Sequence, residues 1–254
     1  MKIAARSGNT EILKKYRRRA DYEQFMKYGA TNGHIEFVKW CKKQGACGYD
    51  SAMRNASLGG HVEIVKLCKE WGARDYNKSM GEAAKGGYVD LIEMFIDWGA
   101  GYWYYAEGVA AESNNCEIIK LLYEKGQRNF YCTLMVASEH ASIDVIKLCR
   151  ELGVNNDDWN KALMSARAHN RLGVIELLFS WGIKNFEIVL RDVVFSKYVE
   201  CIELCKKWGA TDFESVLREA QRMNHDKWWR HEGGENAGDR FIDFCKKLVS
   251  SPDS

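Results

Sequence analysis

Cysteine and histidine are the residues of this chain that could bind a metal or carry out redox chemistry. The sequence has nine cysteines and six histidines. Five cysteines recur at one position of a repeated segment, where other copies carry large apolar residues: Cys41, Cys68, Cys149, Cys205 and Cys245, against Phe95, Leu122 and Leu178. A position shared in this way indicates core packing. No Cys-x-x-Cys pair occurs, so we predict structural thiols in a reducing compartment, with no cofactor.

The remaining chemical motifs are also missing. The chain has no Gly-x-Ser-x-Gly nucleophile, no phosphate-binding loop and no glycine fingerprint after a strand. His34, His61 and His225 fall at one position of the repeated segment, which favours a structural role in a turn. A zinc site formed by His225, His231 and Cys245 is the alternative, but their spacing is not that of a zinc finger. We predict no catalytic residue, no metal and no enzyme.

Four tryptophans precede glycines that close a repeat: Trp71, Trp98, Trp181 and Trp208. We predict that they pack between neighbouring repeats. The alternative is an aromatic stack for single-stranded nucleic acid. The formal net charge of +2, from 37 basic and 35 acidic side chains, gives no strong field for nucleic acid.

The repeat that must position these residues is 27 residues long. Its clearest copy is GHVEIVKLCKEWGA at residues 60–73, and an earlier copy occupies residues 33–46. The closing glycines mark the period: Gly45, Gly72, Gly99, Gly126, Gly153, Gly182 and Gly209. One gap is two residues longer and falls before Trp159. A constant repeat with a variable connection predicts rigid units joined by loops.

Each repeat predicts two helices. Residues 76–83 carry a helical apolar stripe, Gly86 and Gly87 interrupt it, and residues 89–96 form a second stripe that Gly99 ends with a left-handed cap. Neither helix can bury its apolar face alone, so neighbouring units must stack. No alternating strand pattern occurs. The predicted fold is therefore all-α, a solenoid of helix-turn-helix repeats.

These residues resemble a known family. The segment GGHVEIVKLCKEWGA is similar to the turn and second helix of an ankyrin repeat, and the likeness extends over residues 1–249. Two features depart from the family: the T-P-L-H tetrapeptide is absent, and the repeat is shorter than the usual length of about 33 residues. The resemblance implies stacked repeats without β-hairpin fingers that bind proteins without catalysis. Such short, Trp-Gly-Ala-rich units most resemble ankyrin-repeat proteins of giant DNA viruses of amoebae, a resemblance that makes a host protein one candidate partner.

We predict a single solenoid over residues 1–249. Residues 1–20 form an N-terminal cap, 21–210 seven repeats, 211–249 an atypical C-terminal cap with an insert at 226–239, and 250–254 a frayed tail. The insert would cap the core or serve as a second docking site through Trp228, Trp229 and Arg230. The N-terminal cap ends in a basic run that is either a helix end or a nuclear-localisation or phosphate-contacting patch: Lys14, Lys15, Arg17, Arg18 and Arg19.

The predicted binding surface lies on the first helices of the fifth and sixth repeats. Its residues take outward positions that are polar in earlier repeats: Tyr104, Tyr105, Val109, Tyr131, Met135 and Val136. First helices line the concave face of ankyrin-like stacks, and tyrosine and methionine are enriched at interfaces. We therefore expect an apolar, aromatic field that binds a partner protein. The alternative is that rotated helices or a terminal segment bury it.

The function predicted from the sequence is a non-enzymatic scaffold or adaptor. No apolar run is long enough to cross a membrane and no secretory signal begins the chain, which predicts an intracellular protein of the cytoplasm or nucleus without a membrane partner. The alternatives are a nucleic-acid-binding solenoid and a self-associating structural protein. We expect a monomer, and a homodimer through the tyrosines is the other possibility.

Overall fold

The computed structural model describes residues 19–154, 156–190, 199–225 and 237–250. Within these ranges the regular elements are all helices, and no strand is present. The chain divides into two compact units, residues 1–133 and residues 134–254. None of the helices in these ranges is both long enough and apolar enough to cross a membrane. The prediction of an all-α protein is confirmed for the part of the chain that the structure describes.

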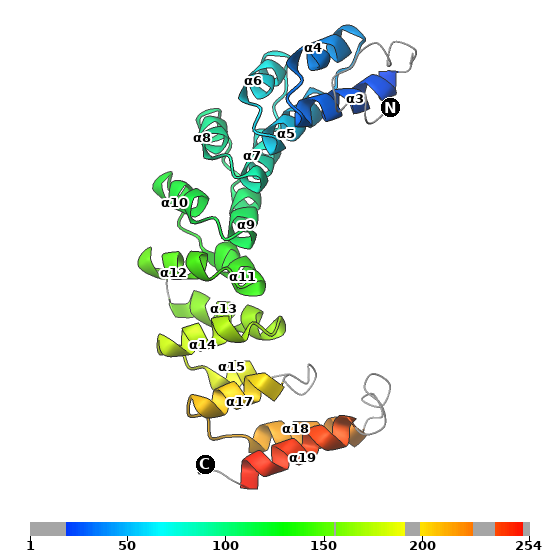
Figure 1. Ribbon diagram of the computed structural model, residues 1–254. Coiled ribbons are helices and arrows are strands. Elements are labelled where there is room, and N and C mark those ends of the chain that lie inside the picture. The colour runs from blue at the N-terminus through cyan, green and yellow to red at the C-terminus, as the bar shows by residue number, and fades with distance from the viewer. Residues whose placement is uncertain (1–18, 155, 191–198, 226–236, 251–254) are drawn as a thin grey trace. The chain divides into compact units, whose positions relative to one another are not determined.

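The first unit consists of helical hairpins. Its helices are α3 (Arg19–Thr31), α4 (Ile35–Lys43), α5 (Tyr49–Leu58), α6 (Val62–Glu70), α7 (Tyr76–Gly86), α8 (Val89–Asp97), α9 (Tyr104–Glu112) and α10 (Cys116–Glu124). The first helices pack in order, α3 on α5, α5 on α7 and α7 on α9, and Figure 1 shows them in one row beside the second helices. Ala56, Ala83 and Ala110 are fully buried. Their small side chains let the first helices approach closely.

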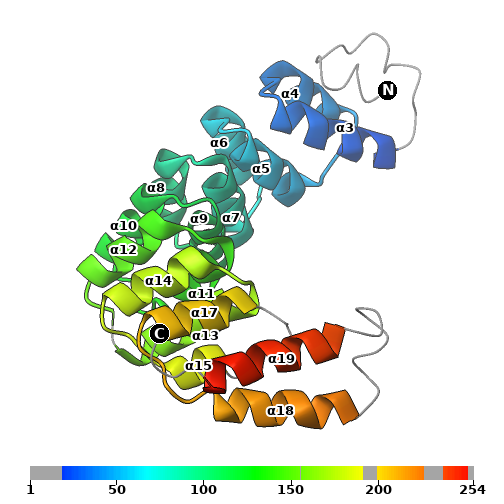
Figure 2. The same cartoon turned by 60° about the horizontal axis from the view of Figure 1, so that its bottom comes forward.

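The second unit continues the hairpin pattern. Helix α11 (Tyr131–His140) starts in the first unit and continues in the second, which also contains α12 (Ile143–Glu151), α13 (Asn156–Ala168), α14 (Leu172–Ser180), α15 (Phe186–Leu190), α17 (Val199–Lys207), α18 (Glu214–His225) and α19 (Ala237–Ser250). Helix α13 packs on α14 and α15, α17 packs on α14 and α15, and α18 packs on α19. Figure 2 shows α18 and α19 side by side.

The second helices end as the sequence predicts. Gly99 has a φ of +96°, and its N–H donates to the Ile96 carbonyl at 2.9 Å. The next residue, Ala100, donates to the Phe95 carbonyl at 2.9 Å. These two hydrogen bonds satisfy carbonyls that the helix leaves open at its end, in a conformation that glycine adopts without steric cost. The other closing glycines of the series also have positive φ.

The tryptophans pack between neighbouring hairpins, as predicted. Lys42 on α4 lies over the Trp71 ring at 4.3 Å, and Lys69 on α6 lies over the Trp98 ring at 3.8 Å. Trp71 also contacts Tyr49, with ring centroids 5.5 Å apart. Cation–aromatic pairs of this kind contribute about 0.5–2 kcal/mol each. The basic side chains therefore help to fix each hairpin on the next.

The repeated cysteines lie in the core, as predicted. The five cysteines of the shared position are fully buried and unbridged: Cys41, Cys68, Cys149, Cys205 and Cys245. Burial raises the pKa of Cys41, Cys68 and Cys205 to about 12, because a thiolate is poorly solvated there. The turn histidine also has its predicted role: His61 Nε2 lies 3.0 Å from the carbonyl oxygen of Thr31, at the end of α3.

The turn between the two helices of a hairpin requires a left-handed residue. In the hairpin turns that the structure describes, its occupants have positive φ: Gly33, Gly60, Gly87, Asn114, Ala141 and Asn170. Ala141, with a φ of 58°, is the residue least suited to this conformation, which costs a non-glycine about 1–2 kcal/mol.

We expect Ala141→Gly to raise the free energy of unfolding by about 0.5–1 kcal/mol, after glycine's own entropic cost. Urea denaturation followed by circular dichroism measures it.

The matched control is Gly87→Ala, the reverse change at the same turn position. Gly87 has a φ of +78°, and an added Cβ would meet only the Asn115 amide nitrogen, at 4.0 Å. We therefore expect Gly87→Ala to lower the free energy of unfolding by about 1 kcal/mol, through the backbone conformation alone. A loss of stability in Ala141→Gly would contradict the left-handed backbone at this turn.

Candidate partner-binding surface

The tyrosines predicted from the sequence are exposed in the first unit. Tyr104 is 42% exposed on α9, and Tyr105 and Tyr131 are exposed to a similar extent. Tyr102, in the loop before α9, is 66% exposed and was not part of the predicted set. We call Tyr102, Tyr104, Tyr105 and Tyr131 the tyrosine surface. Its four side chains are large, partly apolar and rich in solvent-exposed area, as anchors at protein interfaces are.

The other predicted site residues are less accessible or lie elsewhere. Val109 is half-buried on α9, and Met135 and Val136 are half-buried on the part of α11 that belongs to the second unit. Arg19 begins α3, and its side chain is not among those described. The rest of the basic run and the aromatic insert lie outside the described residues: Lys14, Lys15, Arg17, Arg18, Trp228, Trp229 and Arg230. These two candidate sites remain predictions.

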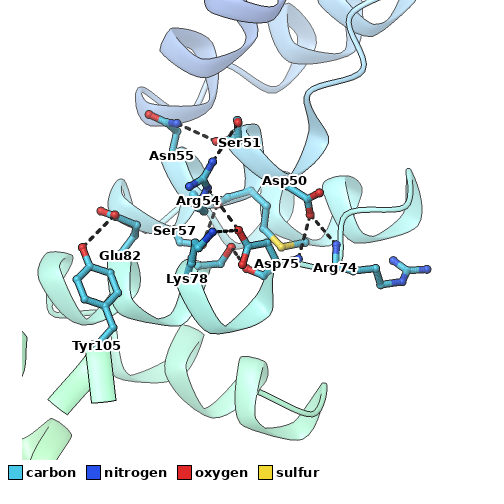
Figure 3. Close-up of polar contacts among 12 residues, drawn as sticks. Asp50, Ser51, Arg54, Asn55, Ser57, Arg74, Asp75, Lys78, Glu82 and Tyr105 are labelled. Carbon is cyan, nitrogen blue, oxygen red and sulfur yellow. Dashed lines mark hydrogen bonds and ion pairs between the residues drawn. The ribbon is translucent and has the colours of Figure 1, made fainter. Parts of the chain in front are cut away.

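Tyr105 is seated on the neighbouring helix. A Cβ added at Gly81 on α7 would overlap the Tyr105 ring, so the ring occupies the space that a side chain would fill there. Its hydroxyl donates a hydrogen bond to Glu82 Oε1 at 3.2 Å (Figure 3). Burial and the Glu82 carboxylate raise the pKa of Tyr105. Glycine and carboxylate therefore hold this tyrosine in one orientation on the surface.

In the earlier repeats, the residue at the position of Tyr104 holds the next loop. Asp50 Oδ1 accepts hydrogen bonds from the backbone N–H groups of Arg74 and Asp75, at 2.7 and 2.9 Å (Figure 3). One repeat later, Asn77 Oδ1 accepts from the N–H of Tyr102 at 2.9 Å. An acceptor at the second residue of the first helix thus fixes the connection that follows.

A different residue takes over this function after Tyr104. Gln127 Oε1 accepts from the N–H groups of Arg128 and Asn129, at 2.9 and 3.2 Å. Asn129 Oδ1 in turn accepts from the N–H of Tyr131 at 3.0 Å. The loop before α11 therefore satisfies its own donors, and the position of Tyr104 is no longer needed for a loop contact.

A buried carboxyl group accompanies this change. Glu107 on α9 is 1% exposed and stands where the preceding repeats have Met26, Met53 and Met80, all fully buried. It hydrogen-bonds to the Gln127 side chain, while its Oε2 is buried without a hydrogen-bond partner among the described residues. Desolvation raises the pKa of Glu107 to about 7, and the Gln127 hydrogen bond opposes the rise.

Gln127 is itself an exception to the repeat. Its position is alanine in the three preceding repeats, Ala46, Ala73 and Ala100, each buried. A methionine and an alanine of the regular repeat are thus replaced together by a hydrogen-bonded glutamate and glutamine. Alignment of the sequence at a spacing of 27 residues would have revealed both exceptions, because polar residues interrupt two otherwise apolar positions.

A second signal in the sequence marks the same region. Residues 86–119 contain no lysine, arginine or histidine but six acidic residues: Asp90, Glu93, Asp97, Glu107, Glu112 and Glu117. This stretch carries a formal charge of −6 in a chain whose total is +2. It includes α8, α9 and three residues of the tyrosine surface. Three of the four tyrosines therefore belong to an acidic stretch of the sequence.

Within the described ranges, no group of three or more histidine, cysteine or acidic side chains is arranged to hold a metal ion. A comparison of the sequence with protein-family models and with curated proteins found no match. The geometry of the tyrosine surface and of the residues that support it is therefore the basis for assigning a function.

Proposed function

We propose that this chain is a non-enzymatic adaptor that binds a partner protein through the tyrosine surface. The observation that carries the proposal is the exposure of Tyr104 and Tyr131. In earlier repeats the same position is occupied by Asp50 and Asn77, whose side chains accept hydrogen bonds from the following loop. Tyrosine side chains frequently dominate the binding energy of protein interfaces. An exposed aromatic residue in place of a structural acceptor is best explained by a use outside the fold.

The supporting substitutions strengthen this interpretation. Gln127 supplies the loop acceptor that Tyr104 does not, and Gly81 leaves room for the Tyr105 ring. Gly81 and Glu82 thus fix the orientation of Tyr105, and Gln127 fixes the backbone of the loop before Tyr131. Side chains held in one orientation before binding lose less conformational entropy when a partner covers them.

The architecture that we propose for the adaptor is an ankyrin-like solenoid of 27-residue units. Its support is the constant register of the repeat and the consecutive packing of first helices in the first unit. On this basis the tyrosines of α9 and α11 would lie on the face where ankyrin-like proteins bind. The sequence resemblance to ankyrin-repeat proteins of giant DNA viruses extends the proposal to a host protein as partner. The acidic stretch disfavours nucleic acid at this face, since phosphates carry negative charge.

Site-specific photo-crosslinking tests the proposal. The photoreactive residue p-benzoylphenylalanine would replace Tyr104 on α9 and, as the control, Val62 on α6, which is 37% exposed on a second helix. We expect a defined partner to be crosslinked in cell lysate from the Tyr104 position and not from the Val62 position. Crosslinks only between copies of the chain would instead support self-association, and equal products from both positions would contradict a site on α9.

A further inference from the structure

The Tyr102 and Tyr104 rings form an exposed aromatic pair. Their centroids are 5.2 Å apart and their planes meet at 71°, so the edge of one ring faces the other. Both side chains are strongly exposed. The loop that carries Tyr102 is held by its hydrogen bond to Asn77. This pair therefore presents aromatic surface to solvent from a fixed backbone.

Elsewhere in the first unit, basic side chains of this chain lie over aromatic rings. Lys42 and Lys69 cover the tryptophans of the following hairpins. Around Tyr102 and Tyr104 the sequence has no basic residue between Lys85 and Lys120. The acidic stretch itself therefore supplies no cation for the Tyr102 and Tyr104 rings.

Carboxylates act on Tyr105, the neighbour of Tyr104 on α9. Glu82 accepts the hydrogen bond from Tyr105, and the charges of Glu82 and Glu112 both act on the Tyr105 hydroxyl. Glu112 is exposed at the end of α9 and belongs to the acidic stretch. Exposed aromatic rings combined with negative charge attract an arginine or lysine side chain, because both the ring quadrupole and the carboxylates favour a cation.

We propose that the tyrosine surface binds a cationic segment of a partner protein, with arginine or lysine side chains over the Tyr102 and Tyr104 rings and Glu82 and Glu112 as counter-charges. The inference rests on the proposed function and specifies the chemistry of the partner. Complementary charge would speed association and select the segment, and the tyrosines would supply most of the contact area.

The test uses a fluorescein-labelled peptide with four arginines separated by Gly-Ser, measured by fluorescence anisotropy at about 150 mM salt, where surface charges are screened beyond about 8 Å. A peptide with citrulline in place of arginine keeps the shape and removes the charge. We expect the arginine peptide to bind at least about tenfold more tightly than the citrulline peptide. Replacing both rings, Tyr102→Leu/Tyr104→Leu, is expected to weaken arginine-peptide binding about fivefold to thirtyfold, from two exposed cation–aromatic contacts.

A matched pair of variants separates a site from general charge attraction. Glu82→Gln/Glu112→Gln removes two charges at the surface, and Glu63→Gln/Glu70→Gln removes two exposed charges on α6. We expect only the first pair to weaken binding. Equal binding of the citrulline peptide, or equal losses in the two charge pairs, would overturn the inference.

Competition with the crosslinked partner distinguishes this inference from the function on which it rests. We expect the arginine peptide to reduce crosslinking from the Tyr104 position. A partner that is captured there and is not displaced by the peptide would refute the cationic segment and leave the adaptor in place. Failure to capture any partner at Tyr104 would refute the adaptor itself.

Discussion

Replacing Glu107 by glutamine is expected to raise the free energy of unfolding by roughly 2–3 kcal/mol at pH 8 and to change it little at pH 4.5. The reason is the buried carboxyl group. Its pKa is raised to about 7 in the folded chain, against 4.5 for an ordinary glutamate. Above pH 7 the native state must therefore keep a poorly solvated charge that the unfolded chain keeps in water. Glutamine occupies the same space without the charge.

The direction of the pH dependence follows from proton binding. Between pH 4.5 and 7 the folded chain retains the Glu107 proton while the unfolded chain has lost it, so the folded state binds more protons. The contribution of this residue to stability therefore falls as pH rises through that window, and is constant above it. This is the reverse of the behaviour of a carboxylate in an ion pair, whose stabilising contribution is lost as pH falls.

Urea denaturation at pH 4.5, 6 and 8, followed by circular dichroism, measures this effect as the difference between wild type and Glu107→Gln. Glu112→Gln is the matched control, because it removes the same charge from an exposed position of the same helix. Its effect is expected to stay within about 0.5 kcal/mol. A difference between wild type and Glu107→Gln that does not change with pH would show that the carboxyl group is solvated in the folded chain.

Sequence periodicity predicted the regular part of this molecule well. The cap at Gly99, the core position of Cys68 and the inter-repeat packing of Trp71 each follow from the residue types that recur at one position of the repeat. The reason is that these features depend on local helix geometry and on burial, which the spacing of apolar residues and glycines specifies.

The supporting contacts of the tyrosine surface could not be predicted in the same way. The seat of Tyr105 on Gly81 and the hydrogen bond of Gln127 to Glu107 join residues about 20 to 24 positions apart, on different elements. Such contacts depend on how one hairpin is rotated on the next, which periodicity does not specify. The sequence did identify Tyr104, Tyr105 and Tyr131 as unusual, because aromatic residues at polar repeat positions are visible without a structure.

The double variant Tyr104→Ala/Tyr131→Ala is expected to weaken partner binding by about 3 kcal/mol or more, a rise in Kd of at least about a hundredfold. Both side chains are exposed, and their truncation opens no core cavity. The loop contacts nearby come from Gln127 and Asn129 and survive the change. We therefore expect the helical content and the free energy of unfolding to change little. Calorimetric titration with the crosslinked partner, together with circular dichroism, measures both quantities.

Tyr88→Ala is the control, and we expect it to change stability and not partner binding. Tyr88 is 38% exposed, close to the exposure of Tyr104, but a Cβ at Gly60 or Gly86 would overlap its ring, so the ring packs tightly against two turns. Its loss should reduce stability, because that packing is lost, and should leave partner binding intact. If both variants instead reduce stability and leave binding unchanged, the exposed tyrosines of α9 and α11 serve the fold. If Tyr104→Ala/Tyr131→Ala reduces binding without reducing stability, and Tyr88→Ala does not, the tyrosines of α9 and α11 bind the partner.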